Sequence, residues 1–102
     1  MDKFDELRKK ILPVLLPYGV NSVAVFGSIV RGEDTLESDI DILVEFEEPP
    51  KKPLGFFTWS RLERELMERL GRKVDLVSAR GLNRYIRPYV EAEKVVFYEK
   101  TR

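Results

Sequence analysis

Two aspartates separated by one residue, Asp39 and Asp41, stand at the start of an apolar run. Successive side chains of a β-strand point to opposite faces, so residues two apart share a face, with Cα atoms about 6.5 Å apart. The pair therefore predicts two carboxylates side by side, which repel each other unless a cation lies between them. A hard divalent ion such as Mg²⁺ suits this arrangement, because it takes oxygen ligands and commonly arrives with a phosphate-bearing substrate.

A third aspartate, Asp75, interrupts another apolar run, between Val74 and Leu76. Three carboxylates on the polar face of one sheet could hold two metal ions about 3.5–4 Å apart, the geometry of in-line phosphoryl and nucleotidyl transfer. Taken alone, Asp75 is explained equally well as an exposed residue of a strand. An isolated Asp-x-Asp pair more often lies on the solvent-exposed face of an edge strand. The three aspartates together favour a metal site.

A turn that can hold phosphate precedes the aspartates. Gly27 and Ser28 follow the apolar run 23–26, and ten residues separate them from the Asp-x-Asp pair. Unpaired backbone N–H groups at the start of a helical turn form an anion site, and glycine lets the backbone approach a phosphate. Taken alone, the dipeptide is more often a turn in which Ser28 caps a helix. Arg31 could contact a phosphate or pair with either aspartate of the pair.

Composition excludes several other chemistries. The 18 basic and 18 acidic residues cancel, which argues against a dedicated nucleic-acid binder. The absence of Cys and His removes disulfides, thiol catalysis, histidine bases and ordinary zinc sites. We expect a single domain over residues 1–102. The charged N-terminus does not resemble a signal peptide, and no apolar run approaches the ~20 residues of a membrane span, so we expect a cytoplasmic protein.

Apolar periodicity predicts the elements that position these residues. Pro13 is expected to kink or end the first helix, Gly71 to end the second, and Pro88 to disturb the third. The proline-rich loop 47–53 is expected to be a mobile surface segment. In chain order the expected elements are helix 2–16, strand 23–26, helical turn 28–31, strand 40–46, helix 57–70, strand 73–77, helix 82–92 and strand 94–99. This order predicts an α/β or α+β fold in which helices cover a sheet.

Aromatic residues outside these motifs are expected to pack rather than to catalyse. Tyr85, Tyr89 and Tyr98 are interpreted as amphipathic packing residues. Apolar residues near Phe56 and Phe57, and those of the last strand, could form an interface, and a core role is an equal alternative.

The motifs together resemble a known signature. The glycine-serine pair, ten intervening residues and Asp39-x-Asp41 resemble the nucleotidyltransferase superfamily, whose fold is that of the catalytic domain of DNA polymerase beta. Arg31 followed by glycine, and the Val-Asp-Leu-Val run at 74–77, also match. The whole chain resembles the minimal nucleotidyltransferases, many of which are antitoxins encoded beside a HEPN-domain toxin. The resemblance implies a nucleotidyltransferase fold with a mixed sheet of about four strands flanked by helices.

The resemblance also implies an activity and its residues. AMP would pass from ATP to a hydroxyl, by resemblance a tyrosine of a HEPN-domain toxin, with two Mg²⁺ ions at the site. The implied roles are metal ligation by Asp39 and Asp41, metal ligation or proton acceptance by Asp75, and binding of the nucleotide by Gly27, Ser28 and Arg31.

One departure from the family pattern opens an alternative function. Many relatives carry Arg directly after Gly-Ser, whereas this chain has Ile29. A contact that neutralises phosphate would then be missing, so a catalytically weak antitoxin that acts as a protein-binding module is the alternative. A polymerase-type role on nucleic acid is disfavoured by the neutral charge, and a homodimer stays open.

Overall fold

The computed structural model describes residues 2–101. The strands are β1 (Val20–Phe26), β2 (Ile40–Phe46), β3 (Val74–Ser78) and β4 (Val95–Glu99). The helices are α1 (Lys3–Leu15), α2 (Ser28–Arg31), α3 (Phe56–Leu70) and α4 (Arg87–Glu93), with 3₁₀ turns at Leu16–Tyr18 and Ala79–Gly81. No helix of this part of the chain is both long and apolar enough to cross a membrane.

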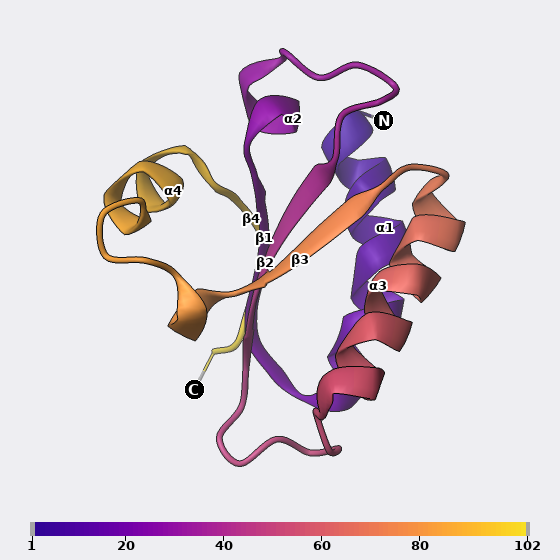
Figure 1. The fold of residues 1–102 in the computed structure, drawn as a ribbon, viewed down its shortest axis with the longest axis vertical. Coiled ribbons are helices and arrows are strands. Elements are labelled where there is room, and N and C mark those ends of the chain that lie inside the picture. The colour runs from indigo at the N-terminus through magenta and orange to yellow at the C-terminus, as the bar shows by residue number, and fades with distance from the viewer. Residues whose placement is uncertain (1, 102) are drawn as a thin grey trace.

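The four strands form one mixed sheet in the order β3-β2-β1-β4. β1 pairs antiparallel with β2 and with β4, whereas β2 and β3 are parallel because α3 connects them as a crossover. Figure 1 shows α1 and α3 on one face of this sheet and α4 on the other. The predicted α+β architecture with a four-stranded mixed sheet is therefore confirmed.

The main core lies between the sheet and the α1–α3 pair. Helical spacing places Ile11 and Leu15 of α1 and Leu62 and Leu66 of α3 on buried faces. These side chains meet the inward positions of the central strands, which are Val23, Val25, Ile40, Ile42 and Val44. Gly71, in the left-handed conformation, ends α3 as predicted.

A smaller apolar cluster lies on the other face of the sheet. Leu82 and Val90 are buried there against Ala24 of β1 and Leu43 of β2. Side chains alternate along β2, so Asp41 lies on the same face as Leu43, and the α4 segment stands beside it. This face, only partly covered, is the one that carries the polar residues of interest.

The two proline-related predictions have different outcomes. α1 continues past Pro13 to Leu15, so of the two expected effects the early helix end is wrong, because the proline lies near the helix end and removes little backbone pairing. The helix predicted at 82–92 begins only at Arg87. Pro88 lies in its first turn, where no N–H is needed, and so starts the helix instead of disturbing it.

Candidate active site

Two of the three aspartates face each other across the parallel strands. Asp41 pairs in register with Asp75, each one residue after the start of its strand. Ile40 and Ile42 flank Asp41 in the sequence and are buried in the main core, so the Asp41 carboxylate points to the opposite face. Asp41 is half-buried and Asp75 is exposed. The strand pairing thus brings together two carboxylates that are far apart in the sequence.

Asp39 lies just before β2, one residue outside the strand 40–46 that the sequence predicts and the structure shows. It is nevertheless close enough to act on its neighbour electrostatically. Burial, and then repulsion from Asp75 and Asp39, raises the pKa of Asp41 to about 6. The three predicted carboxylates therefore form one electrostatic group at this end of the sheet.

The carboxylates fit a magnesium site that is completed by a substrate. Among residues 2–101, no three acidic side chains converge closely enough to hold a metal ion by themselves. Mg²⁺ is commonly bound by one or two carboxylates, with waters and substrate phosphates filling the other positions. Burial and, after it, repulsion from Asp75 and Asp39 raise the pKa of Asp41, and a bound cation would relieve the repulsion. Asp41 with Asp75 or Asp39 meets this requirement.

Gly27 joins β1 to α2 directly beside Asp41. Its φ of 82° and ψ of −153° lie in a region that essentially only glycine adopts. A Cβ atom at this position would collide with Oδ2 of Asp41. Gly27, not Ser28, occupies the N-cap position of α2, and within residues 2–101 the Ser28 hydroxyl makes no hydrogen bond. The turn therefore carries an uncommitted hydroxyl one residue after the glycine that lies against Asp41.

A glutamate from the far end of the chain holds this turn in place. The Gly27 N–H donates to Oε1 of Glu93 at 2.8 Å, and Nη1 of Arg31 donates to Oε2 of Glu93 at 2.9 Å. Nε of Arg31 also donates to Oε1 of Glu33 at 2.8 Å. Arg31 therefore pairs with two glutamates and not with the aspartate pair, although its charge still lowers the pKa of Asp41.

The sequence analysis did not identify Glu93. The residue lies 66 positions after Gly27, so no local pattern connects the two. One signal was present in the sequence. An acidic residue at the C-terminal end of a helix opposes the helix dipole and is usually disfavoured there, which suggests another role for the side chain.

On the expectation from the resemblance that ATP is the substrate, Glu93→Ala should raise the KM for ATP about tenfold, because the turn loses charge-assisted hydrogen bonds worth about 1.5–3 kcal/mol. Glu93→Gln keeps an acceptor for the Gly27 N–H and should retain most of the affinity. Glu91→Ala is the matched control, since Glu91 lies exposed on the same helix and, within residues 2–101, pairs only with Lys94. Steady-state kinetics and titration with ATP measure both effects. An equal loss in the Glu91 variant would contradict the prediction.

Arg72 holds the loop that leads into Asp39. Its guanidinium donates to Oδ2 of Asp34 at 3.1 Å, to the Thr35 carbonyl at 2.7 Å and to the Ser38 carbonyl at 3.0 Å. The side chain is mostly buried, so these bonds are shielded from solvent. Arg72 was not identified from the sequence. In the structure its hydrogen bonds hold the loop that precedes Asp39.

We expect Arg72→Ala to lower the free energy of unfolding at neutral pH by about 2 kcal/mol, because it removes several charge-assisted bonds. The hydrogen bond from Arg72 is the main cause that lowers the pKa of Asp34. This stabilisation is fully present above the ordinary aspartate pKa and is lost as the pH falls through the lower folded-state pKa. Urea unfolding at neutral and strongly acidic pH should therefore show the difference from wild type shrinking in acid. Arg69→Ala, on the exposed surface of α3, is the control. A pH-independent difference would contradict the prediction.

Ile29 lies in the core and not in the site. Only 2 % of it is exposed, and it packs with the main cluster between the sheet and the helices. A side chain at this position therefore supplies packing in this chain. The structure gives Ile29 no contact with the place where a phosphate would approach Gly27.

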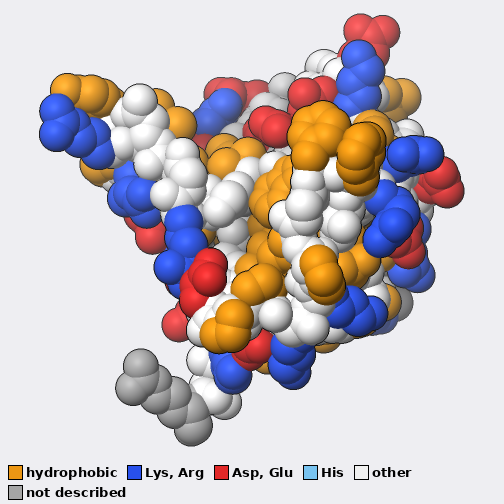
Figure 2. All heavy atoms as spheres, turned by 60° about the horizontal axis from the view of Figure 1, so that its bottom comes forward, with side chains coloured by type: hydrophobic (Ala, Val, Ile, Leu, Met, Phe, Trp, Pro, Cys, Tyr) orange, Lys and Arg blue, Asp and Glu red, His pale blue; other side chains and the backbone are white. Residues whose placement is uncertain are grey.

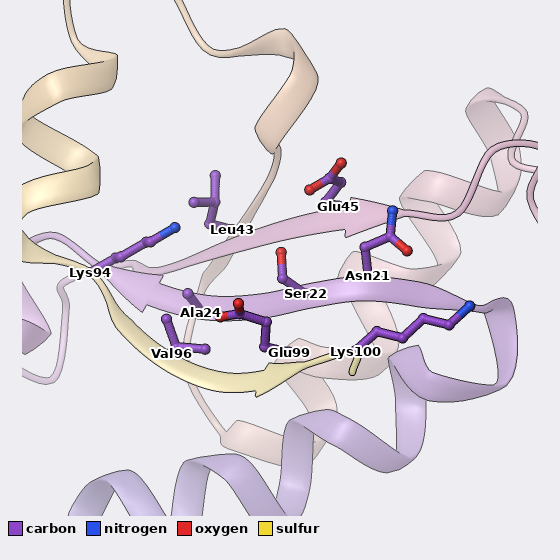
Figure 3. A pocket seen from close by; sticks show the side chains of 9 residues that line it. All are labelled: Asn21, Ser22, Ala24, Leu43, Glu45, Lys94, Val96, Glu99 and Lys100. Atoms are coloured by element: carbon purple, nitrogen blue, oxygen red, sulfur yellow. The ribbon is translucent and has the colours of Figure 1, made fainter. Parts of the chain in front are cut away.

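A hollow of about 310 Å³ lies further along the same sheet face (Figure 3). It begins at Leu43, two residues beyond Asp41, and neither Asp41 nor Asp75 lines it. Its charged lining combines Lys94 and Lys100 with two glutamates, Glu45 and Glu99, so the charges balance. The hollow is therefore separate from the carboxylate group and has no excess of positive charge for a nucleotide.

Comparison with known proteins places this geometry in a family. A family model described as "Polymerase beta, Nucleotidyltransferase" matches residues 9–102. The protein adenylyltransferase MntA of Thermococcus cleftensis is 44% identical over 78 residues, which cover 76% of this chain and 75% of that protein. A solved structure described provisionally as a minimal nucleotidyltransferase is 37% identical with a TM-score of 0.74, and the match covers 93% of this chain and 95% of that one.

A more distant structure shares the fold. It is described as a tri-AMPylated Shewanella oneidensis HEPN toxin in complex with an MNT antitoxin. The matching chain is 22% identical with a TM-score of 0.69, and the match covers 94% of this chain and 72% of that one. The family match and the fold, taken with the facing aspartates beside a glycine turn, lead to one conclusion: the chain belongs to the polymerase beta nucleotidyltransferase family and is a nucleotidyltransferase-like enzyme.

Proposed function

We propose that this protein is a Mg²⁺-dependent adenylyltransferase that transfers AMP from ATP to a tyrosine hydroxyl of a HEPN-domain toxin and thereby acts as an antitoxin. The observation that carries the proposal is the pairing of Asp41 with Asp75 beside Gly27. The name of the Thermococcus relative supports AMP as the transferred group. The AMPylated HEPN toxin in the Shewanella complex supports a HEPN-domain toxin as the acceptor.

Each site residue has a role in this reaction. Asp39 and Asp41 would hold Mg²⁺, which would neutralise charge on the α-phosphate and on the departing pyrophosphate. Gly27 allows the backbone to approach the triphosphate, and the Ser28 hydroxyl is free to donate to it. The acceptor oxygen forms a bond to the α-phosphorus while the bond to the pyrophosphate oxygen breaks. Asp75, the exposed carboxylate, is placed to take the proton of the acceptor hydroxyl or to share the metal.

Label transfer from α-labelled ATP tests the proposal. The purified protein and Mg²⁺ are mixed with a purified HEPN-domain toxin, the proposed acceptor, and the Asp39→Asn variant is assayed alongside. Label on a tyrosine of the HEPN-domain protein with wild type, and none with the variant, is the expected result. Label on no protein while the toxin is still inhibited, equally by wild type and by Asp39→Asn, would support inhibition by contact instead.

A further inference from the structure

Residues 79–93, here called the arm, project from the sheet on the face opposite α1 and α3 (Figure 1). Figure 2 shows this part of the molecule, at the left as in Figure 1, as a lobe carrying basic and hydrophobic side chains and separated from the main body by a hollow. The arm is fixed to the sheet mainly through two buried side chains, Leu82 and Val90. Most of its surface is therefore open to a partner.

Three large apolar side chains of the arm face solvent. Tyr85 is 69% exposed, Ile86 50% and Tyr89 75%. They lie within about one helical turn of each other, as the hydrogen bond from the Tyr89 N–H to the Ile86 carbonyl at 3.1 Å shows. The prediction that the two tyrosines pack in the protein is thus wrong for the described chain. Exposed tyrosines grouped with arginine have the composition of the central part of a protein interface.

The arm carries a small excess of positive charge. Residues 79–93 contain three arginines and two glutamates, and both glutamates follow the last arginine, so residues 79–90 hold no acidic side chain. The Arg84 guanidinium lies 5.0 Å from the centre of the Tyr85 ring and donates to its hydroxyl at 2.9 Å. Within residues 2–101, neither Arg84 nor Arg87 forms an ion pair with a carboxylate. A complementary partner surface is therefore acidic and carries apolar side chains.

The arm is ordered by its own hydrogen bonds before any partner binds. The Arg87 guanidinium donates to the carbonyls of Ala79 at 3.2 Å and Leu82 at 3.0 Å. Oδ1 of Asn83 accepts from the Tyr85 N–H at 2.7 Å. A surface that is already ordered loses little conformational entropy when it binds, so exposed rings placed on it contribute more to affinity.

The arm is physically joined to the candidate active site. Its last residue, Glu93, binds the Gly27 N–H and the Arg31 guanidinium. We propose that the arm is the docking surface for the acceptor protein, which contacts Tyr85, Tyr89 and Arg84 through an acidic surface that carries apolar side chains. This proposal rests on the proposed function, because it assigns the surface that delivers the acceptor hydroxyl to the nucleotide.

The test uses the purified HEPN-domain protein as the probe. Two variants change the arm without removing Arg87: Tyr85→Ser with Tyr89→Ser, and Arg84→Glu. The matched control is Phe56→Ser with Phe57→Ser, because these rings are 79% and 84% exposed but belong to α3 on the other face of the sheet. Calorimetric titration without nucleotide measures binding, and steady-state transfer gives separate KM values for ATP and for the acceptor.

Both arm variants should raise the Kd and the KM for the acceptor about tenfold or more. The KM for ATP should stay at the wild-type value, which a general loss of structure would not allow. Arg84→Glu should also weaken the salt dependence of binding, and the phenylalanine variant should bind as wild type does.

Three results would overturn the docking proposal. These are unchanged acceptor binding in both arm variants, an equal loss in the phenylalanine variant, or no binding by wild type. Binding of a single-stranded RNA oligonucleotide that is lost only in the arm variants, with acceptor binding unchanged, would assign the arm to nucleic acid instead. If wild type binds the HEPN-domain protein but transfers no AMP, the proposed function fails while the binding data still decide the role of the arm.

Discussion

Asp41→Asn should abolish AMP transfer while the protein remains folded. Asn retains the size of Asp but has no negative charge, so it cannot hold Mg²⁺ beside Asp75 as a carboxylate would. We expect the rate of label transfer to fall by about 10²–10³-fold or more, which is typical for the loss of one preorganised electrostatic contact in an active site. Asp39→Asn should behave similarly.

Glu45→Gln is the matched control for Asp41→Asn. Glu45 lies on the same strand and the same face, further from Gly27, and pairs with Arg80. Its neutralisation removes one negative charge from the same sheet face without touching the aspartates. Label transfer should then stay near the wild-type rate. Full activity in the Asp41→Asn protein would refute the assignment of this carboxylate.

The same substitution should stabilise the metal-free protein at neutral pH. The pKa of Asp41 is raised to about 6, so folding favours its protonated form and the ionised carboxylate opposes folding at neutral pH. A shift of about two units corresponds to ~3 kcal/mol at most, and solvent screening of this partly exposed group reduces the gain to about 1 kcal/mol.

The advantage of Asp41→Asn has a defined pH dependence. A raised pKa means that wild type is destabilised fully above pH 6 and progressively less as the pH falls toward the ordinary aspartate pKa of about 3.9. Urea unfolding in the presence of a chelator should therefore show the largest difference at neutral pH and little difference near pH 4. A constant difference across this range would contradict burial and repulsion of the ionised Asp41 carboxylate as the cause.

Gly27→Ala should impair both stability and transfer. The alanine methyl group would collide with Oδ2 of Asp41, and the backbone at φ 82° and ψ −153° disfavours any residue with a Cβ atom. We expect the free energy of unfolding to fall by about 1–3 kcal/mol from backbone strain alone. Displacement of the Asp41 carboxylate should reduce label transfer about 10²-fold, because small errors in the placement of catalytic groups cost that much.

Gly32→Ala is the control that distinguishes the effect of backbone strain from the effect of the collision with Asp41. Gly32 also has a positive φ, 73°, but among the described residues no atom beyond its chain neighbours lies within 4 Å of the place where its Cβ would be. This variant should lose about 1 kcal/mol of stability from the left-handed backbone and should keep its transfer rate. Unfolding curves and label transfer, measured on both variants, compare the two costs. Equal transfer rates in the Gly27 and Gly32 variants would show that the contact with Asp41 is unimportant.

Features that depend on residues close together along the chain could be predicted from the residue types alone. Alternation along residues 40–46 indicated a strand with one buried and one polar face, and β2 (Ile40–Phe46) has these bounds. Helical spacing and Gly71 indicated where α3 lies and where it ends. These signals are readable because each depends on backbone geometry within one or two turns of chain.

Contacts between segments far apart along the chain became known only from the folded structure. Parallel register sets Asp75 opposite Asp41, and no local pattern fixes register between strands separated by a helix. The contact of Glu93 with Gly27 spans 66 residues, and that of Arg72 with the Ser38 carbonyl spans 34. The local sequence around Glu93 and around Arg72 does not indicate which distant residue each one contacts.

Exposure was also decided by the tertiary structure. Tyr85 and Tyr89 are large aromatic residues of the kind that usually pack inside a protein, yet both face solvent. The arm is held to the sheet by the buried side chains of Leu82 and Val90 instead. Periodicity identifies which residues share a face of a helix, but it does not say whether another element covers that face. The chain's residue types therefore determined its strands, helices and carboxylate chemistry, while packing between distant segments determined which residues hold the site and which remain open to a partner.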